Sequence, residues 1–242
     1  HMKALITPDI VYAVGNPTAI TISPDGLKVV YGISRPNRES QKYTNTLWIV
    51  DLDSNNESKV TPRQLTRGDS DGSPRFSPDG DAVAFLRDDS RGTKQIWVLR
   101  MSGGEAGVVT CIPGGIRDFV WKPDSSGFAA VADVDTDYNG EVCDTEISVV
   151  QVSRIRFRHD ELGWRGNGST QIFSIDLRSG VGEQLTDEDG DQGIPAWSPD
   201  GSKLAYVSDA IPRRDICEGN EVRVLDVESG GNACWSKGLA DI

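Results

Sequence analysis

Apolar residues fall in short runs that alternate with turn residues, a pattern typical of β-strands joined by hairpins. One unit occurs four times: a strand, a Pro-Asp turn and a second strand, with the turns at 23–26, 77–80, 122–125 and 198–201. Three of these turns spell Ser-Pro-Asp-Gly, and the third spells Lys-Pro-Asp-Ser. Pro presets φ, Asp can bind its own backbone and Gly accepts a positive φ, so each motif predicts a tight turn.

Each unit continues with a second hairpin. The next strands are predicted at 46–51, 95–99, 171–176 and 221–226, and the clearest short closing strands are Arg63–Thr66 and Glu183–Thr186. Four strands in a unit of about 45 residues are typical of a β-propeller blade. We therefore predict an all-β chain forming a partial β-propeller of about four visible four-stranded blades.

The spacing of the turn aspartates sets the expected boundaries. Asp25, Asp79, Asp124 and Asp200 are 54, 45 and 76 residues apart, so the third unit carries an insertion. We interpret residues 1–2 as a cloning scar. The remaining predictions are an entry segment at 3–16, blade 1 at 17–68, blade 2 at 69–113, blade 3 at 114–190 with an acidic insertion at 133–168, and blade 4 with the start of a next blade at 191–242. A turn near Thr7–Ile10 is the most helix that the sequence suggests.

Charge narrows the classes of partner. The 242 residues hold 25 Lys and Arg against 37 Asp and Glu, a net charge of −12, which argues against nucleic acid and anionic membranes as partners. There is no apolar run of about 18 residues and no signal-peptide pattern, so we expect a cytoplasmic protein. The four cysteines show no C-x-x-C spacing, which disfavours zinc; reduced thiols are favoured, although two disulfides are possible.

The Ser-Pro-Asp-Gly repeats resemble those of the Tol-system periplasmic protein and of the prolyl-oligopeptidase family. The order of elements favours the acylaminoacyl-peptidase branch of that family, with matches at Ile6–Asp9, Ser34–Pro36, Leu47–Asp51, Arg156–Arg158 and Gly163–Trp164. The resemblance implies a propeller of about seven blades, followed by an α/β-hydrolase domain with a Ser-Asp-His triad. Only four blades and no such domain are visible here. It also implies that the propeller admits short peptides to the active site and excludes folded chains.

The chain does contain one Gly-x-Ser-x-Gly pattern, at Gly68–Gly72. A nucleophile elbow needs a strand before its serine and a helix after it, whereas this segment lies between two predicted blades. Apart from the scar, the only histidine is His159 in the insertion. We therefore expect no catalysis by this chain alone, while a longer parent protein would be a serine peptidase.

The insertion matches the calcium-loop pattern D-x-[DN]-x-[DN]-G-x5-E in full. Without flanking helices it is no EF-hand, and a solvated acidic loop remains the alternative. The candidate calcium ligands are Asp135, Asp137, Asn139, Glu141 and Glu146.

A basic stretch follows these acids. Arg154, Arg156 and Arg158 alternate with Ile155 and Phe157, so the arginines share one face of a predicted strand. The face is either a solvated side of a half-buried strand or a patch that attracts peptide carboxylates. By the resemblance, such a patch would help guide substrates.

Two functional hypotheses remain. The chain is either the non-catalytic propeller region of a serine peptidase, which gates and guides short peptides to a hydrolase domain absent here, or a free-standing binding and assembly module. Four blades leave open edges, so we expect self-association as a homo-oligomer; a two-fold dimer could complete an eight-bladed ring. Closure of four blades as a monomer is the alternative.

Overall fold

The computed structural model describes residues 9–52, 61–134, 155, 158–159, 163–164, 168–211 and 219–236. It contains four antiparallel four-stranded sheets, and the described helix α1 is a single turn, Ile10–Ala13. The predictions of an all-β chain and of a partial propeller are thereby confirmed. The chain divides into two compact units, His1–Val109 and Thr110–Ile242.

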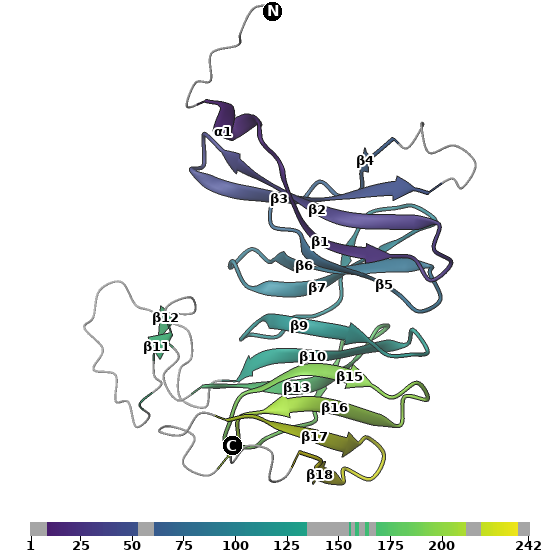
Figure 1. The fold of residues 1–242 in the computed structure, drawn as a ribbon, viewed down its shortest axis with the longest axis vertical. Helices are drawn as coiled ribbons and strands as arrows, with labels where there is room; N and C mark the ends of the chain where they lie inside the picture. Colours follow the sequence, from purple (N-terminus) through teal and green to yellow (C-terminus); the bar gives the residue numbers. More distant parts are fainter. Residues whose placement is uncertain are drawn as a thin grey trace, which may run out of the picture. The chain divides into compact units, whose positions relative to one another are not determined.

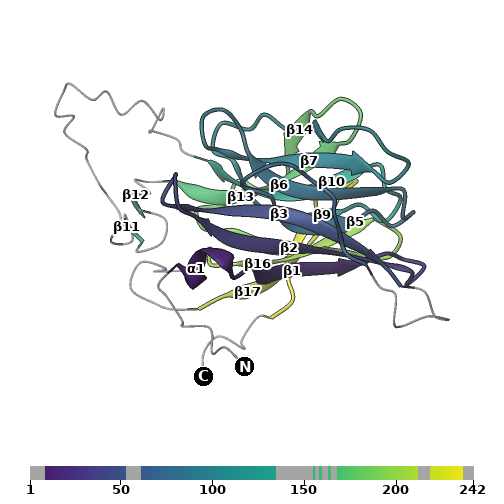
Figure 2. The same cartoon turned by 90° about the horizontal axis from the view of Figure 1, so that it is seen from above.

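The first unit holds two sheets whose strands follow one another in chain order (Figure 1). The first consists of β1 (Asn16–Ile22), β2 (Lys28–Asn37), β3 (Lys42–Asp51) and β4 (Arg63–Gln64). The second consists of β5 (Gly72–Phe76), β6 (Ala82–Asp88), β7 (Lys94–Arg100) and β8 (Gly107–Val108). Helix α1 lies beside β1 and β2 (Figure 2), where Asp9 forms an ion pair with Arg38 at 3.2 Å.

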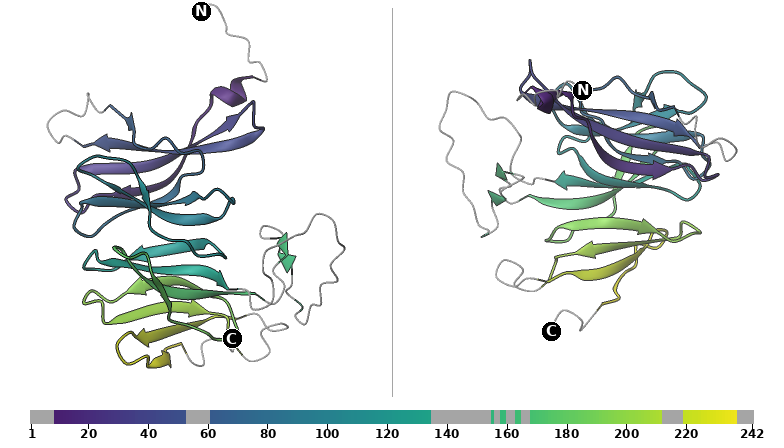
Figure 3. Two further views of the ribbon diagram at one scale, coloured as in Figure 1. Left: turned by 180° about the vertical axis from the view of Figure 1, so that it is seen from behind. Right: turned by 45° about the horizontal axis from the view of Figure 1, so that its top comes forward.

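The second unit repeats this plan. One sheet has β9 (Ile116–Trp121), β10 (Gly127–Val134), β13 (Ser169–Asp176) and β14 (Gly182–Gln184); the other has β15 (Gln192–Trp197), β16 (Lys203–Ser208), β17 (Glu221–Asp226) and β18 (Asn232–Cys234). Strand β10 pairs directly with β13, with Val134 opposite Ser169, so the intervening residues lie outside this sheet. Within them, β11 (Arg158–His159) and β12 (Gly163–Trp164) form a separate two-stranded sheet (Figure 3).

The Ser-Pro-Asp-Gly motif closes its turn with side-chain hydrogen bonds. Ser23 Oγ accepts the Lys28 N–H at 2.8 Å and donates to Asp25 Oδ1 at 2.5 Å, and Asp25 Oδ1 also accepts the Leu27 N–H at 2.9 Å. Gly26 ends the turn with φ 73°, which glycine adopts without strain. The turns at Ser77 and Ser198 have the same bonds. In the turn of the third sequence repeat, Ser125 takes the position of the glycine, with φ 60°.

Each closing strand ends in a bulge rather than continuing to its threonine. Both Leu65 N–H and Thr66 N–H donate to the carbonyl of Leu47, and Thr66 Oγ1 accepts the Leu47 N–H at 2.9 Å. The predicted strand Arg63–Thr66 is therefore two residues too long, because a hydroxyl replaces a backbone carbonyl as acceptor. Thr186 does the same for the Ile172 N–H.

The core of each unit lies between its two sheets. In the first unit the trailing face of sheet β1–β4, defined by Val30, Leu47 and Ile49, packs on the leading face of sheet β5–β8, defined by Phe76, Val83, Phe85 and Leu99. In the second unit a trailing face with Ala129, Val131 and Ile172 packs on a leading face with Leu204, Tyr206 and Leu225. Both units thus use one packing mode, in which the trailing face of one sheet covers the leading face of the next.

Candidate functional site

The end of the first unit where its central hairpins turn carries several charged side chains. The β2–β3 turn is closed by Asn37, whose Oδ1 accepts the N–H groups of Glu39 and Ser40 at 2.9 and 3.1 Å. In the β6–β7 turn, Asp89 Oδ1 accepts the N–H groups of Arg91 and Thr93 at 2.8 and 3.0 Å. These bonds, that from Thr93 above all, lower the pKa of Asp89. Both hairpin ends are therefore fixed by local side-chain caps.

The connection from β4 to β5 joins the two hairpin ends. Asn45 N–H donates to the carbonyl of Asp69 at 2.7 Å, and Asp71 N–H donates to the carbonyl of Asn45 at 3.0 Å. These bonds form a parallel bridge between Asn45 and Ser70. Lys42 and Arg67 each lie three residues before this bridge, so the bridge brings their two backbone segments together at the same end.

A buried ion pair anchors this connection. Asp71 is fully buried and accepts two hydrogen bonds from Arg87, at 2.5 Å from Nε and 3.0 Å from Nη2. The Arg87 guanidinium also lies 4.8 Å from the centre of the Trp97 ring. Gly68 covers the pair so closely that a Cβ there would overlap Asp71 Oδ1 and Arg87 Nε. Close approach of the ion pair therefore requires glycine at this position. Backbone conformation does not require it, since the φ of Gly68 lies outside the left-handed region.

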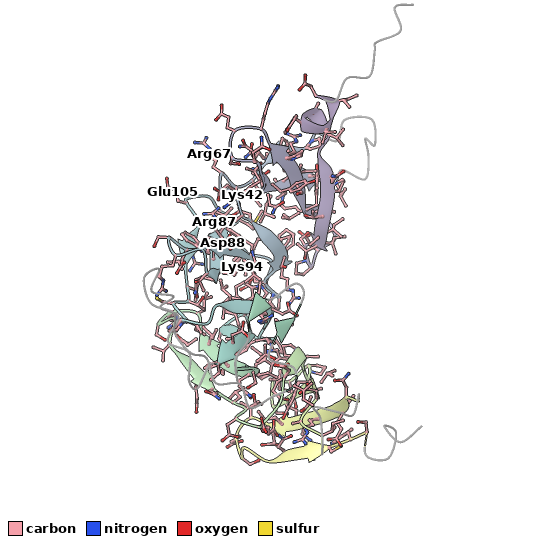
Figure 4. All side chains as sticks on the ribbon, turned by 90° about the vertical axis from the view of Figure 1, so that its left-hand side faces the viewer. Lys42, Arg67, Arg87, Asp88, Lys94 and Glu105 are labelled. Carbon is pink, nitrogen blue, oxygen red and sulfur yellow. The ribbon has the colours of Figure 1, made fainter. Side chains whose placement is uncertain are left out.

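Exposed cations at this end include Lys42 and Arg67, which have no acidic partner among the described residues. Lys94 pairs with Asp88 at 3.2 Å and Arg87 pairs with Asp71, but exposed Lys42 and exposed Arg67 form no ion pair within the described part of the chain. Figure 4 shows the charged side chains on this side of the unit: Lys42, Arg67, Arg87, Asp88, Lys94 and Glu105. In a chain of net charge −12, two such cations on backbone segments that the bridge joins favour binding of a carboxylate.

The geometry of Gly68–Gly72 does not form a nucleophile elbow. The segment leads into strand β5, not into a helix, and Ser70 Oγ accepts the Asp88 N–H at 3.0 Å. Asp71 is engaged by Arg87. The Gly-x-Ser-x-Gly pattern is thus part of a connection between two sheets, and its residues fix that connection.

Most residues predicted for sites lie outside the described residues. This applies to Arg154 and Arg156 and to all five candidate calcium ligands, Asp135, Asp137, Asn139, Glu141 and Glu146. Arg158 lies in β11, opposite Trp164 of β12. Among the described residues, no three His, Cys, Asp or Glu side chains gather as metal ligands, and no described helix is long and apolar enough to cross a membrane.

A second polar network lies beside the core of the second unit, where it reaches the buried Tyr206. Glu188 accepts hydrogen bonds from Arg223 and from Asn232, both at 2.7 Å, and Asn232 also donates to the Tyr206 hydroxyl at 2.6 Å. Burial, together with the charge of Glu188, raises the pKa of Tyr206 to about 12. The network joins the β14–β15 connection to strands β16, β17 and β18, which is a structural role.

Pattern analysis of the sequence did not identify the charged end of the first unit. Asp71 precedes its turn serine by six residues and Arg87 follows it by ten, so Asp71 lies just before β5 and Arg87 lies in β6. The third repeat has a pair of opposite sign, Arg117 and Asp133 at 2.6 Å. These two residues lie five before and eleven after the turn position Lys122, so a position-by-position comparison of the repeats does not align them with Asp71 and Arg87.

Known proteins show the same architecture. The chain is 29% identical to the uncharacterized peptidase YuxL of Bacillus subtilis over 231 residues, which are 93% of this chain and 34% of that protein. Its fold matches the acylaminoacyl peptidase of Pyrococcus horikoshii with a TM-score of 0.71 at 21% identity, covering 93% of this chain and 33% of the other. The β-propeller domain of the trilobed protease of Pyrococcus furiosus gives 0.58 at 18% identity, covering 91% and 57%. No protein-family model matches the sequence.

The fold and these similarities define the class as a partial β-propeller of the kind found in peptidases. More specifically, the expected resemblance to the propeller portion of a prolyl-oligopeptidase-family peptidase is confirmed. The chain spans about a third of the length of the peptidases it matches in this way.

Proposed function

We propose that this chain is the non-catalytic propeller region of a serine peptidase of the prolyl-oligopeptidase family. The observation that carries the proposal is the similarity of 93% of the chain to a third of a peptidase. In this role the region gates access and guides short peptides to a hydrolase domain elsewhere in the parent protein. Rigid hairpins suit gating, because sheets held by capped turns resist the opening that a folded substrate would require.

Guidance of the peptide is assigned to the charged end of the first unit. Lys42 and Arg67 offer two cations to a peptide C-terminal carboxylate, while the buried Arg87–Asp71 pair fixes the connection that carries Arg67. The net charge of −12 repels acidic proteins at long range, so these two cations would select small carboxylates. Arg154, Arg156 and Arg158 remain a second predicted guiding patch.

Titration calorimetry of the chain with short peptides and with their C-terminal amides tests the guiding role. We expect the free carboxylates to bind more tightly than the amides, and Arg67→Glu to weaken carboxylate binding about tenfold through reversal of one charge. Arg63→Glu is the matched control, since Arg63 is an exposed arginine on neighbouring β4. Equal binding of acids and amides, or equal loss in both variants, would contradict this role.

The cytoplasm remains the expected compartment of the protein. Calcium binding by the insertion also remains a prediction. A calcium titration that releases heat and raises the melting temperature would support the loop, and Glu146→Gln should abolish both effects by removing the expected bidentate ligand. Absence of heat and of any thermal shift would end the calcium hypothesis.

The second candidate function is a free-standing assembly module. It is favoured by one observation, the exposure of large apolar side chains on β1 and β17, which are Ile20, Ile22 and Val222.

A further inference from the structure

The internal repeat shows which positions of different sheets are equivalent. Ile22 precedes the turn serine of the first sheet as Phe76 precedes that of the second, so both belong to a leading face. Likewise Ala205 and Val207 follow Ser198 at the same distances at which Val30 and Gly32 follow Ser23, so they belong to a trailing face. In both units a trailing face covers a leading face.

Among the described residues, no sheet packs on the leading face of sheet β1–β4 as sheet β1–β4 packs on that of sheet β5–β8. Ile22 is 57% exposed, whereas its equivalent Phe76 is 8% exposed under the preceding sheet. Ile20 is 70% exposed. Ile22 pairs with Val29 and Ile20 with Tyr31, so the apolar face continues from β1 onto β2.

The trailing face of sheet β15–β18 likewise has no sheet packed on it within the described part of the chain. Val222 pairs with Val207, as Leu47 pairs with Gly32 in the first sheet. Val222 is 43% exposed and Leu47 is fully buried. This face therefore presents the small aliphatic residues of a trailing face without the sheet that covers them in the first unit.

We propose that these two faces bind each other between two copies of the chain, with the trailing face of sheet β15–β18 of one copy on the leading face of sheet β1–β4 of the next. A second copy is the indicated occupant, because the chain carries both halves of a packing that it forms within each unit. The two faces differ, so the contact is head-to-tail and not a two-fold contact of like faces. The proposal needs no hydrolase domain; it rests on the second candidate function, the assembly module, and names the two faces that would associate.

Sedimentation velocity of the 242-residue chain provides the first test. The chain has a mass of 26.2 kDa, and we expect the average mass to rise with concentration to twice this value or more. A mass of 26.2 kDa at every concentration up to the solubility limit would overturn the proposal.

Two variants test the direction of the contact. Ile22→Lys charges the leading face and Val222→Lys charges the trailing face, at exposed positions where a lysine is compatible with the folded monomer. Each variant alone should be monomeric. An equimolar mixture should form a one-to-one dimer and nothing larger, because one intact face of each kind remains.

Val181→Lys is the control, since Val181 is 67% exposed between β13 and β14 and belongs to neither face. It should associate as the unaltered chain does. Association of either face variant alone would show that like faces meet, and a monomeric mixture would show that the two faces do not bind; both results would overturn the proposal.

Discussion

Gly68 and Gly72 stand at the two ends of one short connection, but their surroundings differ. A Cβ at Gly68 would overlap the Arg87–Asp71 ion pair, whereas a Cβ at Gly72 meets nothing within 4 Å. We expect Gly68→Ala to lower the free energy of unfolding by about 2–3 kcal/mol, because it separates a charge pair whose aspartate is fully buried. Gly72→Ala should change it by no more than about 1 kcal/mol. Urea unfolding of both variants measures the difference, and equal losses would contradict this account of the connection.

A single aspartate, Asp200, also makes the free energy of unfolding depend on pH. The Ser198 hydroxyl, followed by the Ser202 N–H, lowers the pKa of Asp200 from the ordinary 3.8 to about 2. The ionised form therefore stabilises the fold above about pH 4, and this contribution is lost as the pH falls towards 2. Asp200→Asn should be less stable than the unaltered chain at pH 7, with a gap that narrows between pH 4 and pH 2. Thermal unfolding over this range would refute the assignment if the gap stayed constant.

At the scale of elements, the closing strands depend on a hydroxyl acceptor. Thr66→Val leaves the buried Leu47 N–H without its acceptor and should cost about 1–3 kcal/mol. Thr66→Ser keeps the hydroxyl and should recover most of this loss. Urea unfolding distinguishes the two variants, and an equally destabilised serine variant would show that the methyl group, not the hydrogen bond, is responsible.

Hairpins were predictable from the sequence because each turn motif contains its own hydrogen-bonding partners. The ends of the strands were less predictable from the sequence. Strands β2 and β3 extend to Asn37 and from Lys42, beyond the apolar runs at 28–33 and 46–51, because Arg35 and Pro36 stay extended opposite Thr44 and Tyr43. The ion pair at the charged end of the first unit could not be predicted by counting from the turn. Gly72 pairs with Leu86, which places Asp71 opposite Arg87, only after a register shift between Gly72 and Arg75.

At the scale of the whole molecule, the repeat explains which sheet faces are packed and which remain exposed. Two pairs of sheets bury their shared faces, while the first leading face and the last trailing face retain exposed apolar residues. The similarity to a peptidase covers 93% of this chain but only 34% of that peptidase. Further blades in a longer parent protein would cover the two open faces. Self-association would use the same faces, so it is expected of this chain alone and not of a parent protein in which further blades cover them.

The central claim is that these residues form the propeller region of a longer serine peptidase. The most direct test is to determine the coding sequence beyond the codon for Ile242. The account predicts an open reading frame that continues through further Ser-Pro-Asp-Gly units into a hydrolase domain, with a Gly-x-Ser-x-Gly motif between a strand and a helix. A stop codon at or close to Ile242 would contradict it.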